Sequence, residues 1–129
     1  MFSKKNKNTS TFDKNGASRI SSVIAEDVSF NGNLTGESGL RIEGKFEGEI
    51  NLEGLLVIGE DAVVTCTSIS AIKIIIAGQV HSNLNAAKVE IRATGKVWGD
   101  IDAESFVIEE GAFLHGKINM KEPQQIEED

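Results

Sequence analysis

The side chains best suited to nucleophilic or proton-transfer chemistry near neutral pH are one cysteine, Cys66, and two histidines, His81 and His115. A nucleophilic cysteine needs a neighbour that lowers the pKa of its thiol, and no such residue lies near Cys66 in the sequence. Each histidine allows two interpretations, a catalytic base or an exposed surface side chain, and we favour the second. Both histidines occupy the same place in two similar stretches, GQVHSNL and AFLHGKI, which indicates an internal repeat.

Other kinds of chemical site leave no pattern in the sequence. Histidine, cysteine and carboxylate residues do not cluster at the spacings of metal ligands. The glycines recur with the repeat and lack the strand–loop–helix setting of a phosphate-binding loop. Acidic residues alternate along the chain as on a solvated strand face, and no acid–base pair stands out. We therefore expect no catalytic residue, no metal and no cofactor.

The repeat has a period of seventeen residues. GKFEGEI starts at residue 44, GQVHSNL at 78, GKVWGDI at 95 and AFLHGKI at 112, and a degenerate copy, DAVVTCT, starts at 61. An earlier copy, VSFNGNL, starts at 28, sixteen residues before the first full one. The result is about six units between residues 23 and 120, each too small to bury an apolar face without its neighbours.

Inside each unit, apolar or small residues alternate with polar ones, as Val97, Gly99 and Ile101 alternate with Lys96 and Asp100. A period of two is that of a β-strand, and no window has the period of a helix. Short strands in a seventeen-residue unit form one coil of a parallel β-helix. The expected fold class is therefore all-β, a single-domain parallel β-helix of about six coils, with glycine at its crowded corners.

Stacking the units at a strict period predicts columns of side chains that point into the β-helix. One such column contains Leu40, Val57, Ile74, Ile91 and Ile108, and others contain Phe46, Val63, Val80, Val97 and Leu114, or Ile50, Thr67, Leu84, Ile101 and Ile118. Both histidines fall in an outward column with Glu47 and Trp98. These side chains are expected to face solvent.

The coil around residues 57–69 allows two registers. The strict period turns Val57, Asp61, Val63 and Thr65 inward, whereas a slip by one residue turns Ile58, Ala62, Val64 and Cys66 inward. We favour the slip, because it buries more apolar surface and no aspartate, and it requires a bulge before Ile69. An outward apolar surface around Val57 and Ile75 would then be either a partner-binding site or ordinary surface scatter.

The net charge of −7 is unevenly placed along the 129 residues. Residues 1–20 carry five basic side chains and one acidic one, and residues 121–129 carry one basic and four acidic ones, which leaves −8 for the middle. An acidic body argues against general nucleic-acid binding. No stretch has the length of a transmembrane helix, and MFSKKNKNTSTF lacks the apolar core of a signal peptide, so a cytosolic protein is expected.

The composition divides the chain into three segments. We expect a disordered basic N-terminal tail over residues 1–22, a β-helix domain over 23–120 and a disordered acidic C-terminal tail over 121–129. The N-terminal tail begins with an apolar tip followed by lysines. Its candidate membrane-binding residues are Met1, Phe2, Lys4, Lys5 and Lys7.

Both ends of the β-helix are expected to self-associate. Soluble solenoids need polar capping repeats, but here the terminal coils are as apolar as the middle ones. The predicted polymerisation interface consists of Val28, Phe30, Leu34, Phe106, Ile108, Phe113 and Ile118. Contact between like ends would give a non-polar filament, and contact between unlike ends a polar one.

Three stretches, LRIEGKFEGEI, KVEIRATGKVWGDIDAE and FVIEEGAFLHGKINM, together resemble the bactofilins, a family of bacterial cytoskeletal proteins. The start, MFSKK, is similar to the membrane-targeting N-terminus of many bactofilins. The resemblance implies a right-handed β-helix that polymerises end to end, without nucleotide, into non-polar filaments. It also implies that these filaments lie on the inner face of the cytoplasmic membrane and position cell-wall enzymes and other morphogenesis proteins. The chain departs from the family pattern around Cys66 and at Ser82, and its N-terminal tail lacks proline.

A different class of protein is the alternative: a β-helical enzyme of the hexapeptide-repeat acyltransferase type, or a monomeric binding module. The acyltransferases also have short apolar–glycine units, but their period is eighteen, and they usually carry a catalytic histidine and a C-terminal helix. Here the period is seventeen, and no helical pattern follows Met120. We therefore favour the homopolymeric scaffold.

Overall fold

The computed structural model describes residues 20–121, and every regular element in this range is a β-strand. The predicted tails lie outside the described residues, except for 20–22 and 121. The strands are β2 (Ile20–Ile24), β3 (Ser29–Gly36), β4 (Gly39–Ile42), β5 (Lys45–Leu52), β6 (Leu55–Ile58), β7 (Val63–Ser70), β8 (Lys73–Ile76), β9 (Gln79–Ile91), β10 (Lys96–Trp98), β11 (Ile101–Ile108), β12 (Phe113–His115) and β13 (Ile118–Met120).

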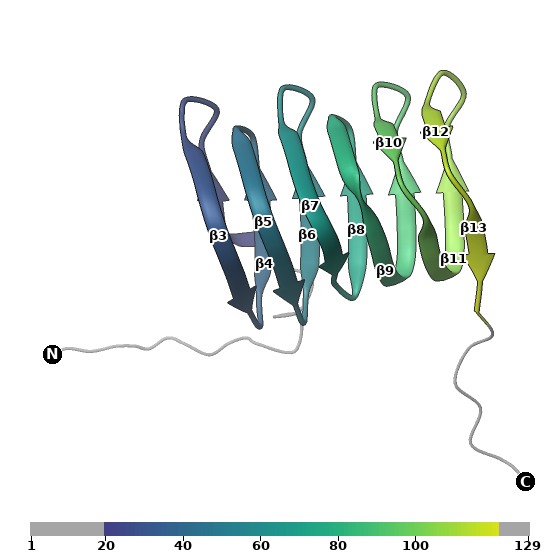
Figure 1. Cartoon of the computed structure of the whole chain (residues 1–129), viewed down its shortest axis with the longest axis horizontal. Helices are drawn as coiled ribbons and strands as arrows, with labels where there is room; N and C mark the ends of the chain where they lie inside the picture. The colour runs from purple at the N-terminus through teal and green to yellow at the C-terminus, as the bar shows by residue number, and fades with distance from the viewer. Residues whose placement is uncertain (1–19, 122–129) are drawn as a thin grey trace, which may run out of the picture.

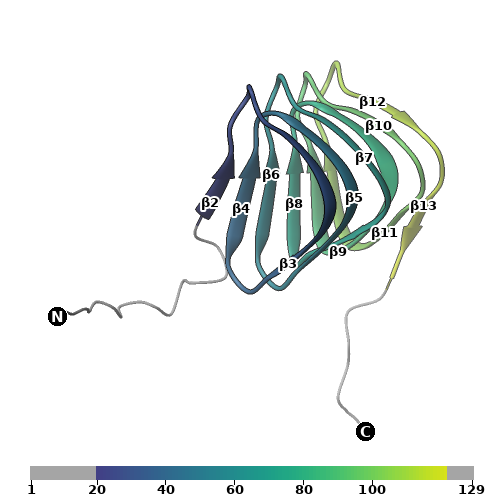
Figure 2. The same cartoon turned by 60° about the vertical axis from the view of Figure 1, so that its left-hand side comes forward.

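The strands wind into a parallel β-solenoid of about six turns, which confirms the predicted fold class. Each inner strand pairs in parallel with the strand one turn before it and the strand one turn after it. Strands β2 and β3 lie at one end of the stack, and β12 and β13 lie at the other (Figures 1 and 2). The solenoid therefore has two ends and a continuous side wall.

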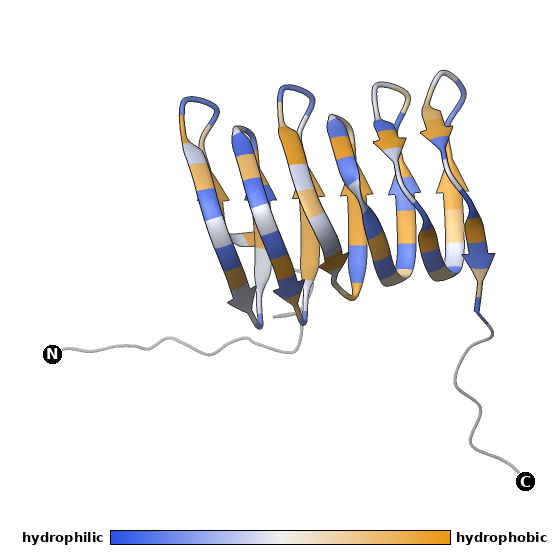
Figure 3. Cartoon of the chain, viewed as in Figure 1, coloured by the Kyte–Doolittle hydropathy of each residue, from blue (hydrophilic) through white to orange (hydrophobic). Residues whose placement is uncertain are grey.

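The interior is filled by one apolar side chain from every second strand position. In β5, Phe46, Ile50 and Leu52 are buried, while Glu47 and Glu49 between them are exposed. The same alternation gives the striped strands of Figure 3. The core residues include Ile42, Phe46, Ile50, Leu56, Ile58, Val64, Ile69, Ile74, Ile76, Val80, Leu84, Val89, Ile91, Val97 and Ile101. Burial of these side chains is the main force that holds the coils together.

The strict seventeen-residue columns are wrong in part. Strand pairing places Leu40 in one column with Leu56, Ile74, Val89 and Phe106, at intervals of 16, 18, 15 and 17 residues. Val57 therefore lies outside this column, and the predicted members Ile91 and Ile108 belong to the neighbouring one. That neighbouring column contains Ile24, Ile42, Ile58, Ile76, Ile91 and Ile108. The turns of 16 and 15 residues outweigh the one of 18, so the column ends at Phe106, two residues before the position that the strict period predicts.

The predicted slip in the coil around residues 57–69 is confirmed. Ile58, Ala62 and Val64 are buried, and Cys66 packs against the core. Asp61 faces solvent. The register of β7 shifts against β5 and β9 just before Ile69, where we expected a bulge. This irregularity lets Ile69, rather than Thr67, occupy the column of Ile50 and Leu84.

Glycine occupies a corner of the solenoid where successive coils touch through their backbones. Gly48, Gly99 and Gly116 have φ of 138°, 147° and 152°, a region that favours glycine. A Cβ atom on Gly99 would overlap the carbonyl oxygen of Ser82 in the preceding coil. Beside this corner, Asn83 Oδ1 accepts a hydrogen bond of 3.1 Å from the backbone N–H of Asp100. Gly99 therefore has no room for a side chain, although Cys66 and Ser82 occupy the same corner in two other coils.

Candidate polymerisation interface

The N-terminal end of the solenoid exposes the beginning of its apolar interior. Phe30 and Leu34 are the first side chains of two inward columns, and both are only partly buried. The Phe30 ring stacks on that of Phe46 in the next coil, with centroids 5.0 Å apart and planes within 7°. Strands β2 and β3 each have one strand neighbour among the described residues, so a row of backbone groups faces outward there. Val28, in the turn before β3, is exposed.

The C-terminal end is equally apolar. Phe106 ends the column of Val89 and is partly buried, whereas Ile108 and Ile118 end two other columns and are 45% and 39% exposed. Strand β12 has β10 as its one described neighbour, and β13 has β11. Within residues 20–121, each end of the solenoid therefore combines open apolar columns with an unpaired edge of the sheet.

Two positions at the C-terminal end differ from the predicted arrangement of the interface. Phe113 pairs with Lys96, which is an outward position, and it contacts Trp98 on the side wall with ring centroids 5.3 Å apart. Leu114 is the side chain that ends the column of Val97, and the predicted interface omitted it. The repeat did contain the signal, because Leu114 aligns with Val97 at seventeen residues.

The two histidines lie on the outer wall, as expected. His81 and His115 are exposed and flank Trp98 in the same column. The His81 imidazole stacks on the Trp98 indole, with centroids 4.4 Å apart and planes within 2°. This contact occupies one face of the imidazole and gives the histidine a structural role.

Cys66 lies in a partly buried position against the core. Burial raises the pKa of the Cys66 thiol to about 11, while a backbone hydrogen bond with Gly48 lowers it and the charge of Glu49 raises it. The thiol is therefore protonated at neutral pH, which is the opposite of what a nucleophile needs.

Two further features are absent from residues 20–121. Within this range, no three histidine, cysteine, aspartate or glutamate side chains form a group that could hold a metal ion. No helix of this range is long and apolar enough to cross a membrane. The candidate membrane-binding residues Met1, Phe2, Lys4, Lys5 and Lys7 lie outside the described residues.

Over residues 20–121 the chain is a parallel β-solenoid with apolar side chains at both ends, and this arrangement is typical of β-solenoid proteins that self-associate. The comparisons with known proteins name the group within this class. A protein-family model described as "Bactofilin: Polymer-forming cytoskeletal" matches residues 22–119. The chain belongs to the bactofilin family, as the sequence resemblance predicted.

Two curated relatives come from Myxococcus xanthus (strain DK1622). Bactofilin BacP is 32% identical over 99 residues, which cover 76% of this chain and 41% of BacP. Bactofilin BacO is 31% identical over 110 residues, which cover 84% of this chain and 86% of BacO. The chain thus matches most of BacO but less than half of the length of BacP.

A solved structure shares the solenoid. It is described as a cryo-EM reconstruction of Thermus thermophilus bactofilin double helical filaments. Its TM-score is 0.74 at 27% sequence identity, and the match covers 78% of this chain and 99% of that one. The shared fold and family support a cytoskeletal filament role.

Proposed function

We propose that this chain polymerises end to end through its two open solenoid ends, and that the filament is a membrane-associated scaffold. The observation that carries the proposal is that inward columns finish in apolar side chains at both ends, next to unpaired strand edges. Burying one such side chain contributes about 1.5–3 kcal/mol. A second copy stacked on the same axis would also satisfy the open backbone groups.

In the part of the chain that the structure describes, this apolar surface is already exposed, and we propose that the assembly needs no nucleotide. Like ends and unlike ends both offer apolar columns. We propose contact between like ends, which gives a non-polar filament, because the family resemblance favours it.

The membrane and partner roles rest on the sequence and the family. The tip Met1 and Phe2, followed by Lys4, Lys5 and Lys7, suits weak insertion into an anionic leaflet. We propose that filaments lie on the inner face of the cytoplasmic membrane and there position cell-wall enzymes or other morphogenesis proteins.

The test of the interface is Phe106→Arg, examined by electron microscopy of the purified chain without nucleotide. An arginine there would place a charge in a desolvated apolar junction. We expect long filaments from the wild type and a folded monomer or short oligomer from the variant, with the β-sheet circular dichroism unchanged. His115→Arg is the matched control, because His115 is exposed on the wall of the last coil, and its filaments should persist. Long filaments from Phe106→Arg would exclude this residue from the contact.

A further inference from the structure

One side of the solenoid wall has an apolar centre. This side, here called the β4–β6–β8 face, consists of β2, β4, β6 and β8 with residues 88–91 of β9 and 105–108 of β11. Strands β6 and β8 are apolar over most of their length, so they present apolar side chains outward as well as inward (Figure 3). Val57 and Ile75 point outward at the centre and are partly exposed. Arg41 and Arg92 line a shallow hollow around them.

The outward side chains at the middle position of these strands form a row whose chemistry is antisymmetric about its centre. From the N-terminal coil to the C-terminal coil the row reads Val23, Arg41, Val57, Ile75, Glu90 and Val107. The centre lies between Val57 and Ile75. At equal distance from it, a cation on one side corresponds to an anion on the other, and a valine corresponds to a valine. The row two residues earlier, with Lys73 and Lys88 on the same side of the centre, does not share this property.

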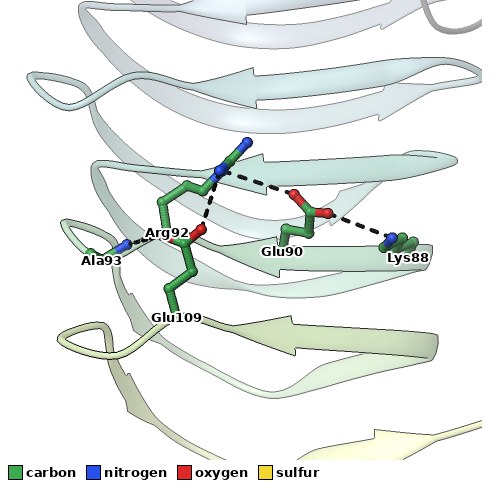
Figure 4. A network of polar contacts seen from close by, with 5 residues as sticks. All are labelled: Lys88, Glu90, Arg92, Ala93 and Glu109. Carbon is green, nitrogen blue, oxygen red and sulfur yellow. Dashed lines mark hydrogen bonds and ion pairs between the residues drawn. The ribbon is translucent and has the colours of Figure 1, made fainter.

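A second row, two residues further along each strand, has the same property at its four central positions, with the signs exchanged. Backbone hydrogen bonds between coils align Glu43, Gly59, Ala77 and Arg92 there, and Glu109 extends the row beyond Arg92 without a charged counterpart at the other end. Glu43 and Arg92 are equally far from its centre. Within the chain, Arg41 forms an ion pair with Glu43, and Arg92 lies 3.9 Å from Glu90 and 3.2 Å from Glu109 (Figure 4). Along the strand direction, Arg41 and Glu43 therefore place a positive charge before a negative one, whereas Glu90 and Arg92 place a negative charge before a positive one.

Two copies can place these faces together in two symmetric ways. A two-fold axis parallel to the strands reverses the order of the coils and keeps the position along the strand. Arg41 of one copy then faces Glu90 of the second, Glu43 faces Arg92, and Val57 faces Ile75. Sheets packed face to face lie about 10 Å apart, a gap that long charged side chains can bridge.

The other arrangement is unfavourable. A two-fold axis along the solenoid keeps the order of the coils and reverses the strand direction. Arg41 then faces Arg41 of the second copy, Glu90 faces Glu90, and Lys88 faces Arg92. Like charges opposed across an interface disfavour it, so the face itself selects between the two arrangements.

We infer that the β4–β6–β8 face is a lateral pairing surface whose partner is a second copy of this chain, with its coils running in the opposite direction. The inference deepens the proposed filament, because it joins two filaments side by side. The apolar centre supplies the contact area, and the two exchanged charge pairs at each end fix the register.

Charge reversal with rescue tests the pairing. Electron micrographs of wild-type filaments should show two strands side by side. Arg41→Glu and Glu90→Arg should each lose the pairing and give single strands of unchanged length, and the double variant should regain it, because the opposed charges attract again. Lys96→Glu is the matched control, because it makes the same charge change on another side of the wall and should keep paired filaments. Unpaired wild-type filaments, or pairing that both single variants retain, would overturn the inference.

Cross-linking tests the direction. In a Cys66→Ala background, Arg41→Cys and Glu90→Cys chains are prepared separately, mixed before assembly and treated with a short bis-maleimide. The two positions lie three coils apart, about 14 Å along the solenoid, so the opposed arrangement predicts cross-linked dimers in the mixture and a loss of them in either chain alone. Dimers from Arg41→Cys alone would show coils running in the same direction and would refute the inference, as would no dimers in the mixture. If the chain forms no filaments, the proposed end-to-end assembly is wrong. Cross-linking of the same variants still tests the lateral contact independently.

Discussion

At the scale of single residues, the glycine corner shows how closely the coils approach one another. Gly32 and Gly99 both have φ near 150°, but only Gly99 lies above a preceding described coil. A Cβ atom on Gly99 would overlap the Ser82 carbonyl oxygen, whereas one on Gly32 would have its nearest neighbour at 3.6 Å, in the Phe30 ring. The two positions therefore separate the strain of the backbone angle from the clash between coils.

We predict that Gly99→Ala destabilises the solenoid more than Gly32→Ala does. The backbone strain costs roughly 1–3 kcal/mol at either position, and the clash adds to it only at Gly99. Thermal unfolding followed by circular dichroism, at matched protein concentration, measures the difference. Equal melting temperatures for the two variants would show that the coils relax around the new methyl group.

The Cys66 thiol gives a prediction about alkaline pH. Its pKa is raised to about 11 in the folded chain, above the ordinary cysteine value of about 8.5 in an unfolded one. The stability that the protonated thiol contributes is complete below the unfolded pKa and is lost as the pH rises through the folded pKa. The melting temperature of the wild type should therefore fall relative to Cys66→Ala between about pH 9 and about pH 11. A pH-independent difference between the two proteins would contradict a buried neutral thiol.

At the scale of the element, each strand separates an apolar interior from a polar wall. Ile101 and Val97 are fully buried in the coil that also exposes Lys96. Ile101→Ala should cost about 2–5 kcal/mol through lost contacts and a cavity. Lys96→Ala should change stability by less than about 0.5 kcal/mol. Chemical denaturation of both variants checks this, and similar losses would refute the alternation of buried and exposed positions.

Alternation and period were sufficient to predict the parallel solenoid, its number of turns and the slip that buries Ile58 and Val64. They were not sufficient to predict every column. The interval from Leu56 to Ile74 is one residue longer than the period, and the next, from Ile74 to Val89, is two residues shorter. Because apolar residues also occur two positions away in the neighbouring column, a strict alignment still finds an apolar residue at each later position and hides the shift.

The lateral face was the part of the site that the sequence could not specify. Val57 and Ile75 could be identified as an outward apolar pair, but Arg41 and Glu90 are 49 positions apart along the chain. Arg41 and Glu90 lie at equal distances from the centre of the face because the coils between them differ in length. These lengths are known only from the strand pairing.

At the scale of the whole molecule, filament formation and membrane binding should depend on each other. Ordering one tail opposes the small gain from its apolar tip and lysines, so one chain should bind membrane weakly. A filament presents many tails, and its later tails bind at high effective concentration.

We predict that wild-type filaments float with liposomes that contain anionic lipid. Deletion of residues 2–7 should abolish flotation but not polymerisation, and Phe106→Arg should float poorly with its tail intact. If the truncated and the full-length filaments float equally, the membrane role is wrong and a scaffold without membrane binding remains.

The central claim is that copies stack on one solenoid axis through their ends, and fibre diffraction from aligned filaments tests it most directly. Coaxial stacking places the strand spacing of about 4.8 Å along the filament axis, so about six turns give a subunit rise of about 29 Å. Contact between like ends doubles the true repeat to about 58 Å. We expect a strong meridional reflection near 4.8 Å together with one of these repeats. A 4.8 Å reflection on the equator would show solenoids lying across the filament and would contradict end-to-end assembly.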